Sequence, residues 1–171
     1  PSCVENTTTY ANLHVFDLSG AYVAGANFTN ADLSGVSFTN CEIDFHKKNN
    51  PIVFKDLRGC NFTGADLSNS DFTHAFIFDS NLSYAKLTNT IFYQSEMALS
   101  TFSFSDLTES NLIQTDLIST NFTGSNLSGS DLSLSYSKNA IFTDIKTNDN
   151  TKLDYCFDKG TIDRTICLVL R

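Results

Sequence analysis

The sequence is poor in basic side chains. Its 171 residues include 11 Lys and Arg against 19 Asp and Glu, which gives a formal net charge of −8 at pH 7. Proteins that bind nucleic acid contact its phosphates through a surface rich in Lys and Arg. The charge balance therefore argues against nucleic acid as a direct ligand.

Long apolar runs are also missing. No stretch of the sequence approaches the ~18 consecutive apolar residues that predict a transmembrane helix. We therefore expect no segment to span a membrane.

The sequence motifs of metal binding and catalysis are absent as well. His14, His46 and His74 lie in unrelated contexts, and no Cys-x-x-Cys or His-x-x-x-His spacing occurs. We find no Gly-rich phosphate loop, no nucleophile elbow and no pair of carboxylates that predicts a pocket. The expectation is a protein that is not an enzyme and that needs no metal or other cofactor.

What the sequence does contain is a five-residue repeat. From Leu57 to Leu132 a large apolar residue returns at every fifth position, and from Cys60 onward a small residue stands two places before each. Asp or Asn commonly lies between the two, as in Ala65-Asp66-Leu67. An α-helix shows apolar residues at a spacing of about 3.6 and a half-buried strand at about 2, so neither explains the pattern.

A unit of five residues cannot bury an apolar face alone, so copies of it must stack, as in a solenoid. Segments 61–72 and 121–132 nearly match at a separation of 60 residues, which is three times twenty. This favours four repeats, or twenty residues, in each coil.

The repeat resembles that of the pentapeptide-repeat family, whose consensus is roughly Ala-(Asp/Asn)-Leu-x-x, and the likeness covers residues 11–142. It implies an all-β fold, a right-handed four-sided parallel β-helix of about six coils with a C-terminal cap. In that fold the central large residue and the small residue two before it point inward, and the other three face outward.

The chain is expected to form a single domain. Its spacing breaks between Ile43 and Leu57, which are fourteen residues apart instead of fifteen, so a loop must interrupt the coils there. The C-terminal segment is rich in apolar residues and is expected to cover the open end of the helix. The expected parts are a leading segment 1–10, first repeats 11–43, an interruption 44–56, main repeats 57–142 and a cap 143–171.

Five cysteines allow no complete pairing. Cys41 and Cys60 occupy inward small-residue positions and form either a disulfide or two buried thiols, of which the thiols are the commoner state in such repeats. Cys156 and Cys167 are candidates for a disulfide in the cap. That disulfide would favour an extracytoplasmic location, and reduced thiols would favour the cytoplasm.

The coil length assigns each repeat to a side, which we name by its central residues. Side one holds Leu57, Ile77, Met97 and Leu117, side two Phe62, Leu82, Phe102 and Phe122, side three Leu67, Leu87, Leu107 and Leu127, and side four Phe72, Phe92, Leu112 and Leu132.

Outward apolar residues concentrate on sides one and four, which adjoin. These candidate interface residues are Phe76, Phe78, Ile91, Tyr93, Leu99, Ile113, Ile118 and Tyr136. No basic residue lies between Lys86 and Lys138, and the acids in that half form a candidate acidic surface of Glu96, Asp106, Glu109, Asp116 and Asp131. Side two instead shows a neutral hydroxyl and amide ladder, broken at its corner by Tyr84 and Phe104.

Two binding functions follow. The first is a protein-binding or structural scaffold that self-associates or docks an unidentified protein partner through the edge of sides one and four, because contiguous exposed apolar residues usually mark an interface. The alternative comes from the family resemblance, since some members, including quinolone-resistance proteins, protect DNA gyrase by imitating duplex DNA. Sugar or ice binding on side two would rest only on hydroxyl ladders that the repeat itself produces.

Charge density favours the first function. Residues 11–142 hold thirteen Asp and Glu and six Lys and Arg, a net charge of −7. About six coils extend over roughly 30 Å, a length of duplex DNA that carries about 17 phosphate charges. Mimicry would reach less than half of the charge of the duplex.

Overall fold

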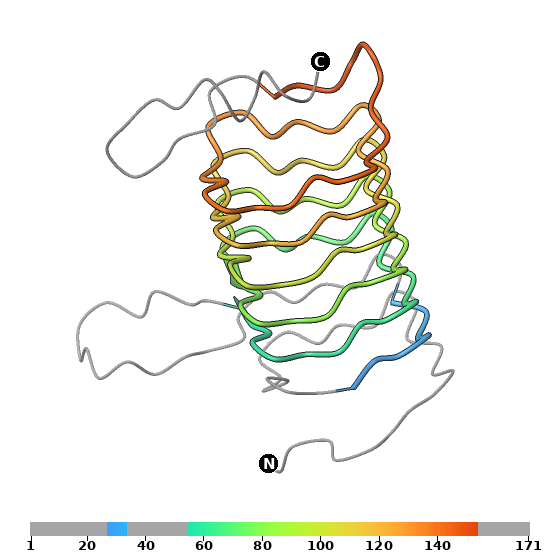
Figure 1. The fold of residues 1–171 in the computed structure, drawn as a ribbon. Helices are drawn as coiled ribbons and strands as arrows, with labels where there is room; N and C mark the ends of the chain where they lie inside the picture. Colours follow the sequence, from blue (N-terminus) through green and yellow to red (C-terminus); the bar gives the residue numbers. More distant parts are fainter. Residues whose placement is uncertain (1–26, 34–54, 154–171) are drawn as a thin grey trace, which may run out of the picture.

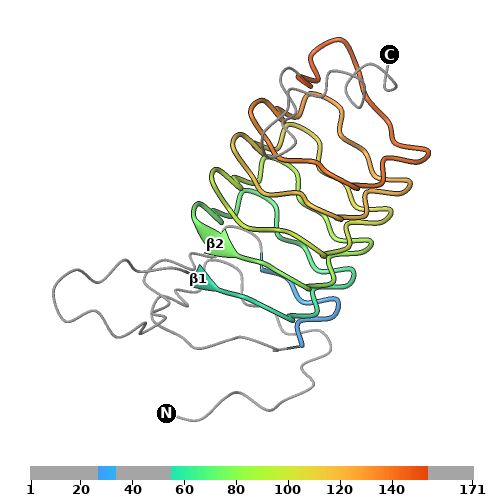
Figure 2. The ribbon, with the colours of Figure 1, turned by 60° about the vertical axis from the view of Figure 1, so that its left-hand side comes forward.

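The computed structural model describes residues 27–33 and 55–153, which form a stack of similar coils (Figure 1). Within these residues two strands are assigned, β1 (Lys55–Asp56) and β2 (Ala75–Phe76). They pair in parallel, with Lys55 opposite Ala75, and lie on neighbouring coils (Figure 2). Each side of a coil is only one repeat long, so the other sides pair through single bridges instead of longer strands.

The bridges follow the twenty-residue spacing that the sequence predicts. On side two Asn61 pairs in parallel with Asn81, which pairs with Thr101, and the ladder continues through Asn121 to Ile141. The other three sides show equivalent ladders. Residues that differ by twenty in number therefore lie directly above one another.

The inserted residues are visible in the first described coil. Asn27 pairs with Asn61, a separation of 34 residues, whereas Asn61 pairs with Asn81, a separation of 20. The chain between residues 33 and 55 therefore holds 14 residues more than an uninterrupted coil would need. The strand β1 occupies the last two positions of the segment 44–56 that the sequence assigns to the interruption.

Each repeat ends in a tight turn. In one example the Ala65 N–H donates to the Phe62 carbonyl at 2.9 Å, and Gly64 between them has φ +67°. A positive φ at the third residue of such a turn is the signature of type II, which favours Gly or Asn. We call this third residue the corner residue of its side.

The interior confirms the inward positions predicted for the repeat. The central residues from Leu57 to Leu132 are at most 1% exposed. Phenylalanines stack between coils, with ring centroids 5.1 Å apart for Phe72 and Phe92 and 5.3 Å apart for Phe102 and Phe122. The core is a column of side chains that fills the axis of the helix.

The small inward positions fall into two groups. Ser80 Oγ donates to the Leu57 carbonyl at 2.7 Å and also accepts the Cys60 N–H at 3.2 Å. In contrast, within the described residues the buried hydroxyls of Ser95, Ser110 and Ser125 have no hydrogen-bond partner. A buried polar group without a partner loses its hydration and gains nothing in return.

We therefore expect Ser125→Ala to raise the free energy of unfolding by about 1–2 kcal/mol, because the variant removes an unsatisfied hydroxyl with little change of volume. Urea denaturation monitored by circular dichroism measures the change. The control is Ser80→Ala, which leaves two backbone groups without a partner and should lower the free energy of unfolding by about 1–3 kcal/mol. Shifts of the same sign in both variants would contradict this assignment of the two groups.

Candidate protein-binding surface

Side one presents a mixed column of outward residues. The residues before its centres are Asp56, Phe76, Glu96, Asp116 and Tyr136, which are joined in this order by parallel pairing. Glu96 and Asp116 are direct neighbours in the ladder, where coils lie about 4.8 Å apart. Like charges in directly paired positions are unfavourable, so this acidic pair lowers the stability of the fold.

The eight candidate interface residues all occupy outward positions, but they differ in exposure. Four are more than one third exposed: Phe78 and Ile91 at 40%, Leu99 at 54% and Tyr136 at 37%. The other four, Phe76, Tyr93, Ile113 and Ile118, are half-buried. The structure adds Leu134, a corner residue of side four that is 38% exposed and that the candidate set omitted.

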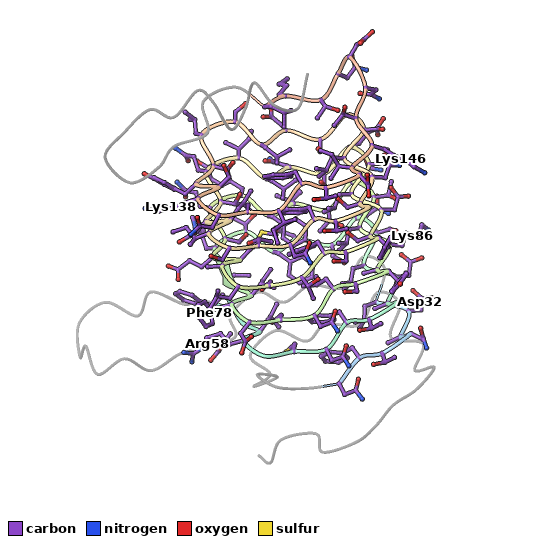
Figure 3. The ribbon with its side chains drawn as sticks, viewed as in Figure 1. Asp32, Arg58, Phe78, Lys86, Lys138 and Lys146 are labelled. Atoms are coloured by element: carbon purple, nitrogen blue, oxygen red, sulfur yellow. The ribbon has the colours of Figure 1, made fainter. Side chains whose placement is uncertain are left out.

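The basic residues of side one lie toward its two ends. Arg58, Phe78 and Lys138 share the column that follows the centres, and their side chains line one edge of the molecule, whereas Asp32, Lys86 and Lys146 of side three line the opposite edge (Figure 3). The apolar and acidic residues of side one therefore lie between a basic residue in the first coil and another in the last.

The candidate acidic residues do not share one face. Glu96 and Asp116 belong to side one, Asp106 and Glu109 to side three, and Asp131 to side four. Asp106 accepts hydrogen bonds from the Thr108 backbone N–H at 3.1 Å and from Asn126 Nδ2 at 3.3 Å. The acidic half of the sequence therefore becomes three separate small groups.

Three carboxylates are matched by neighbouring cations. Burial raises the pKa of Asp56, which is 2% exposed, but hydrogen bonds from the Arg58 side chain and backbone and its positive charge outweigh burial and hold the pKa below the usual value of 3.8. The Arg58 guanidinium contacts both carboxylate oxygens at 2.8 Å.

The other two matched carboxylates are Asp66 and Asp131. Burial again opposes a lower pKa, and hydrogen bonds from Ser68 and Lys86 to Asp66, and from Ser133 and Lys152 to Asp131, bring both pKa values down. The ion pairs measure 3.1 Å for Lys86 and Asp66 and 2.9 Å for Lys152 and Asp131. These pairs reduce the negative charge that sides three and four present to a partner.

Within residues 27–33 and 55–153, no group of three or more His, Cys, Asp or Glu side chains is placed to hold a metal ion. No helix in these two ranges is long and apolar enough to cross a membrane. Cys60 is buried in its inward position. The candidate disulfide partners Cys156 and Cys167, and also Cys41, lie outside the described residues.

Solved structures show similar proteins. HetL from the cyanobacterium Nostoc, a pentapeptide repeat protein involved in the regulation of heterocyst differentiation, is 25% identical with a TM-score of 0.54. The likeness covers 83% of this chain and 57% of HetL, so this chain spans little more than half of the length of that relative.

Two further structures are more distant. Rfr23 from the cyanobacterium Cyanothece is 22% identical over 77% of this chain and 90% of its own, with a TM-score of 0.31. A trypsin-treated variant of QnrB1, a plasmid-mediated fluoroquinolone resistance protein, is 17% identical over 94% of this chain and 81% of its own, with a TM-score of 0.43. No curated protein sequence matches the chain.

The sequence profile of the pentapeptide repeats matches residues 9–46, 56–94 and 95–133, in eight copies. These segments make up well over half of the chain and carry the twenty-residue ladders described above. The chain therefore belongs to the pentapeptide repeat family, whose members fold into right-handed quadrilateral β-helices.

Proposed function

We propose that this β-helix is a non-enzymatic protein-binding scaffold that self-associates through the edge formed by sides one and four. The observation that carries the proposal is the distribution of exposed large apolar side chains. Five of the eight in the described residues lie on these two sides: Phe78, Ile91, Leu99, Leu134 and Tyr136. Apolar residues gathered on one part of a surface usually mark a protein interface.

The charges of side one support a second copy as the partner. Glu96 and Asp116 lie in the middle of the side, and Lys138 lies in its last coil. A copy that is displaced along the helix axis can therefore place its Lys138 against an acid of the first copy. Such pairing would offset the repulsion between the two neighbouring carboxylates.

A regulatory rather than catalytic role also agrees with HetL, whose involvement is in the regulation of differentiation. The repeat fills the axis of the helix with side chains, which leaves no interior cavity for a substrate. We therefore place the function on the outer surface.

We do not adopt gyrase protection by DNA mimicry as the function. Three carboxylates of the described coils pair with Arg58, Lys86 and Lys152. The candidate acids are also divided among three sides instead of forming two continuous rows. Protection of gyrase from a quinolone in a supercoiling assay would overturn this choice.

The test is the double variant Phe78→Asp with Ile118→Asp. Both side chains occupy outward positions of side one, so the β-sheet circular dichroism spectrum should stay unchanged. A buried carboxylate at an interface is costly, so light scattering should give the mass of a single chain for the variant and of at least two chains for the wild type.

The matched control is Tyr84→Asp with Phe104→Asp, which places the same charges on exposed aromatic positions away from the edge. This variant should keep the mass of the wild type. A wild type of single-chain mass at all concentrations would refute self-association. A double variant at Phe78 and Ile118 that keeps the mass of the wild type would show that another surface makes the contact.

A further inference from the structure

Side two differs in chemistry from the rest of the surface. From residue 27 to residue 143 its outward positions before and after each centre hold no acid and no base in the described coils, although the chain has a net charge of −8. They hold hydroxyl and amide side chains in successive coils, namely Asn61, Thr63, Asn81, Ser83, Thr101, Ser103, Asn121 and Thr123. A charged ligand finds no opposite charge on this face.

The amides of this face are held in one orientation. Asn61 Oδ1 accepts the Thr63 backbone N–H at 3.1 Å and the Thr63 hydroxyl at 2.6 Å, and Asn121 Oδ1 accepts the same pair from Thr123 at 2.9 and 2.6 Å. Asn81 Oδ1 accepts the Ser83 N–H at 3.0 Å. The oxygens are thus occupied within the turn, and each amide nitrogen is left with two donors.

These donors are unused in the protein. Among the described residues, the side-chain nitrogens of Asn61, Asn81 and Asn121 donate no hydrogen bond. The neighbouring hydroxyls that donate to an amide oxygen still have lone pairs to accept with. Side two therefore offers donors and acceptors that repeat along the axis at about 4.8 Å per coil.

An exposed aromatic pair borders this face. Tyr84 and Phe104 are corner residues of side two, 63% and 54% exposed, with ring centroids 5.2 Å apart and planes within 13° of each other. Both have a left-handed φ, +60° and +59°, which is unfavourable for bulky side chains. Neither ring contributes to the interior.

The next coil makes room for the pair. A Cβ atom at Gly124 would lie 2.5 Å from Phe104 Cδ1, so the Phe104 ring lies over this glycine. Two strained corners and a glycine thus maintain an aromatic ledge that packing of the core does not need. Backbone strain of this kind that the core does not require is a pointer to function.

We propose that side two and its aromatic corner bind a neutral polysaccharide. Sugar rings have apolar C–H faces, which suit Tyr84 and Phe104, and hydroxyls that both donate and accept, which suit the amide and hydroxyl ladder. A polymer matches the face because both repeat along one direction. Nucleobases also stack on aromatic rings, but their phosphates would meet an acidic protein with no basic group on this face.

The experiment is native gel electrophoresis in gels that contain one soluble neutral polysaccharide each: a mixed-linkage β-glucan, starch, galactomannan or xylan. Alginate, an acidic polysaccharide, serves as the charged comparison. We expect at least one neutral polymer to retard the wild type and alginate not to. In Tyr84→Ala with Phe104→Ala, the dissociation constant for that polymer should rise by at least about tenfold.

The matched variant is Phe78→Ala, which removes an exposed ring from side one and should leave retardation unchanged. Circular dichroism establishes that both variants keep their fold. The proposal is overturned if no neutral polymer retards the wild type, if the aromatic variant is retarded equally, or if Phe78→Ala loses binding as well. Because the surface is separate from the edge of sides one and four, either proposal can fail without the other.

Discussion

Phe102→Ala is expected to lower the free energy of unfolding by about 3–5 kcal/mol. The Phe102 side chain is 0% exposed. Its ring stacks on Phe122 with centroids 5.3 Å apart and meets the edge of Phe92 at 5.9 Å. Coils above and below hold their backbones at the spacing of the ladder, so they cannot collapse into the space that the ring leaves, and the cavity adds to the lost burial.

Phe104→Ala is the control for this prediction. It removes the same ring two residues later, from a side chain that is 54% exposed, so the loss should stay within about 0.5 kcal/mol. Urea denaturation of both variants measures the difference. Equal losses would mean that the alternation of inward and outward positions is assigned to the wrong residues.

Deletion of Thr101–Ser103 is expected to abolish folding altogether. Every later residue would move three positions relative to the coil before it, so that the central Leu107 would occupy the place of Phe104 at an exposed corner. A shift of register that turns the apolar residues outward removes the burial that stabilises a β-structure. We expect insoluble protein or a spectrum without β-structure.

Deletion of a whole coil, residues 101–120, is the matched comparison. Asn121 would then follow Ser100 and pair with Asn81 in the same ladder, because the deleted length equals one bridge spacing. In solenoids each coil contacts only its neighbours, so the shortened chain should fold and unfold cooperatively. If this deletion destroys the fold as the short one does, the coils are not the interchangeable units that the ladders imply.

The interior could be predicted from the sequence because burial in this repeat depends on local spacing. Positions such as Leu67, Leu87 and Leu107 are large and apolar at every fifth residue, and all are buried. The small positions between them, such as Ser80 and Thr90, are buried as expected. Which hydroxyl finds a carbonyl was not predictable, since that depends on contacts with the previous coil.

The exposure of the candidate interface was only partly predictable. The sequence places Phe78 and Ile118 in the same outward column, but the first is 40% exposed and the second half-buried. Neighbours in adjacent coils cover such side chains to different extents. The sequence also grouped five acids by position along the chain, whereas the ladders distribute them over three sides.

The sequence by itself determined the five-residue unit, the coil length and the residues of the interior, because one apolar and one small position recur at a fixed spacing. Only the tertiary structure decided how the charges and aromatic rings meet. Lys86 pairs with Asp66 and Tyr84 with Phe104 because each partner is twenty residues away along the chain and one coil away in space. Stacking converts that separation into contact, and the rotamers of the two side chains then decide whether they bind.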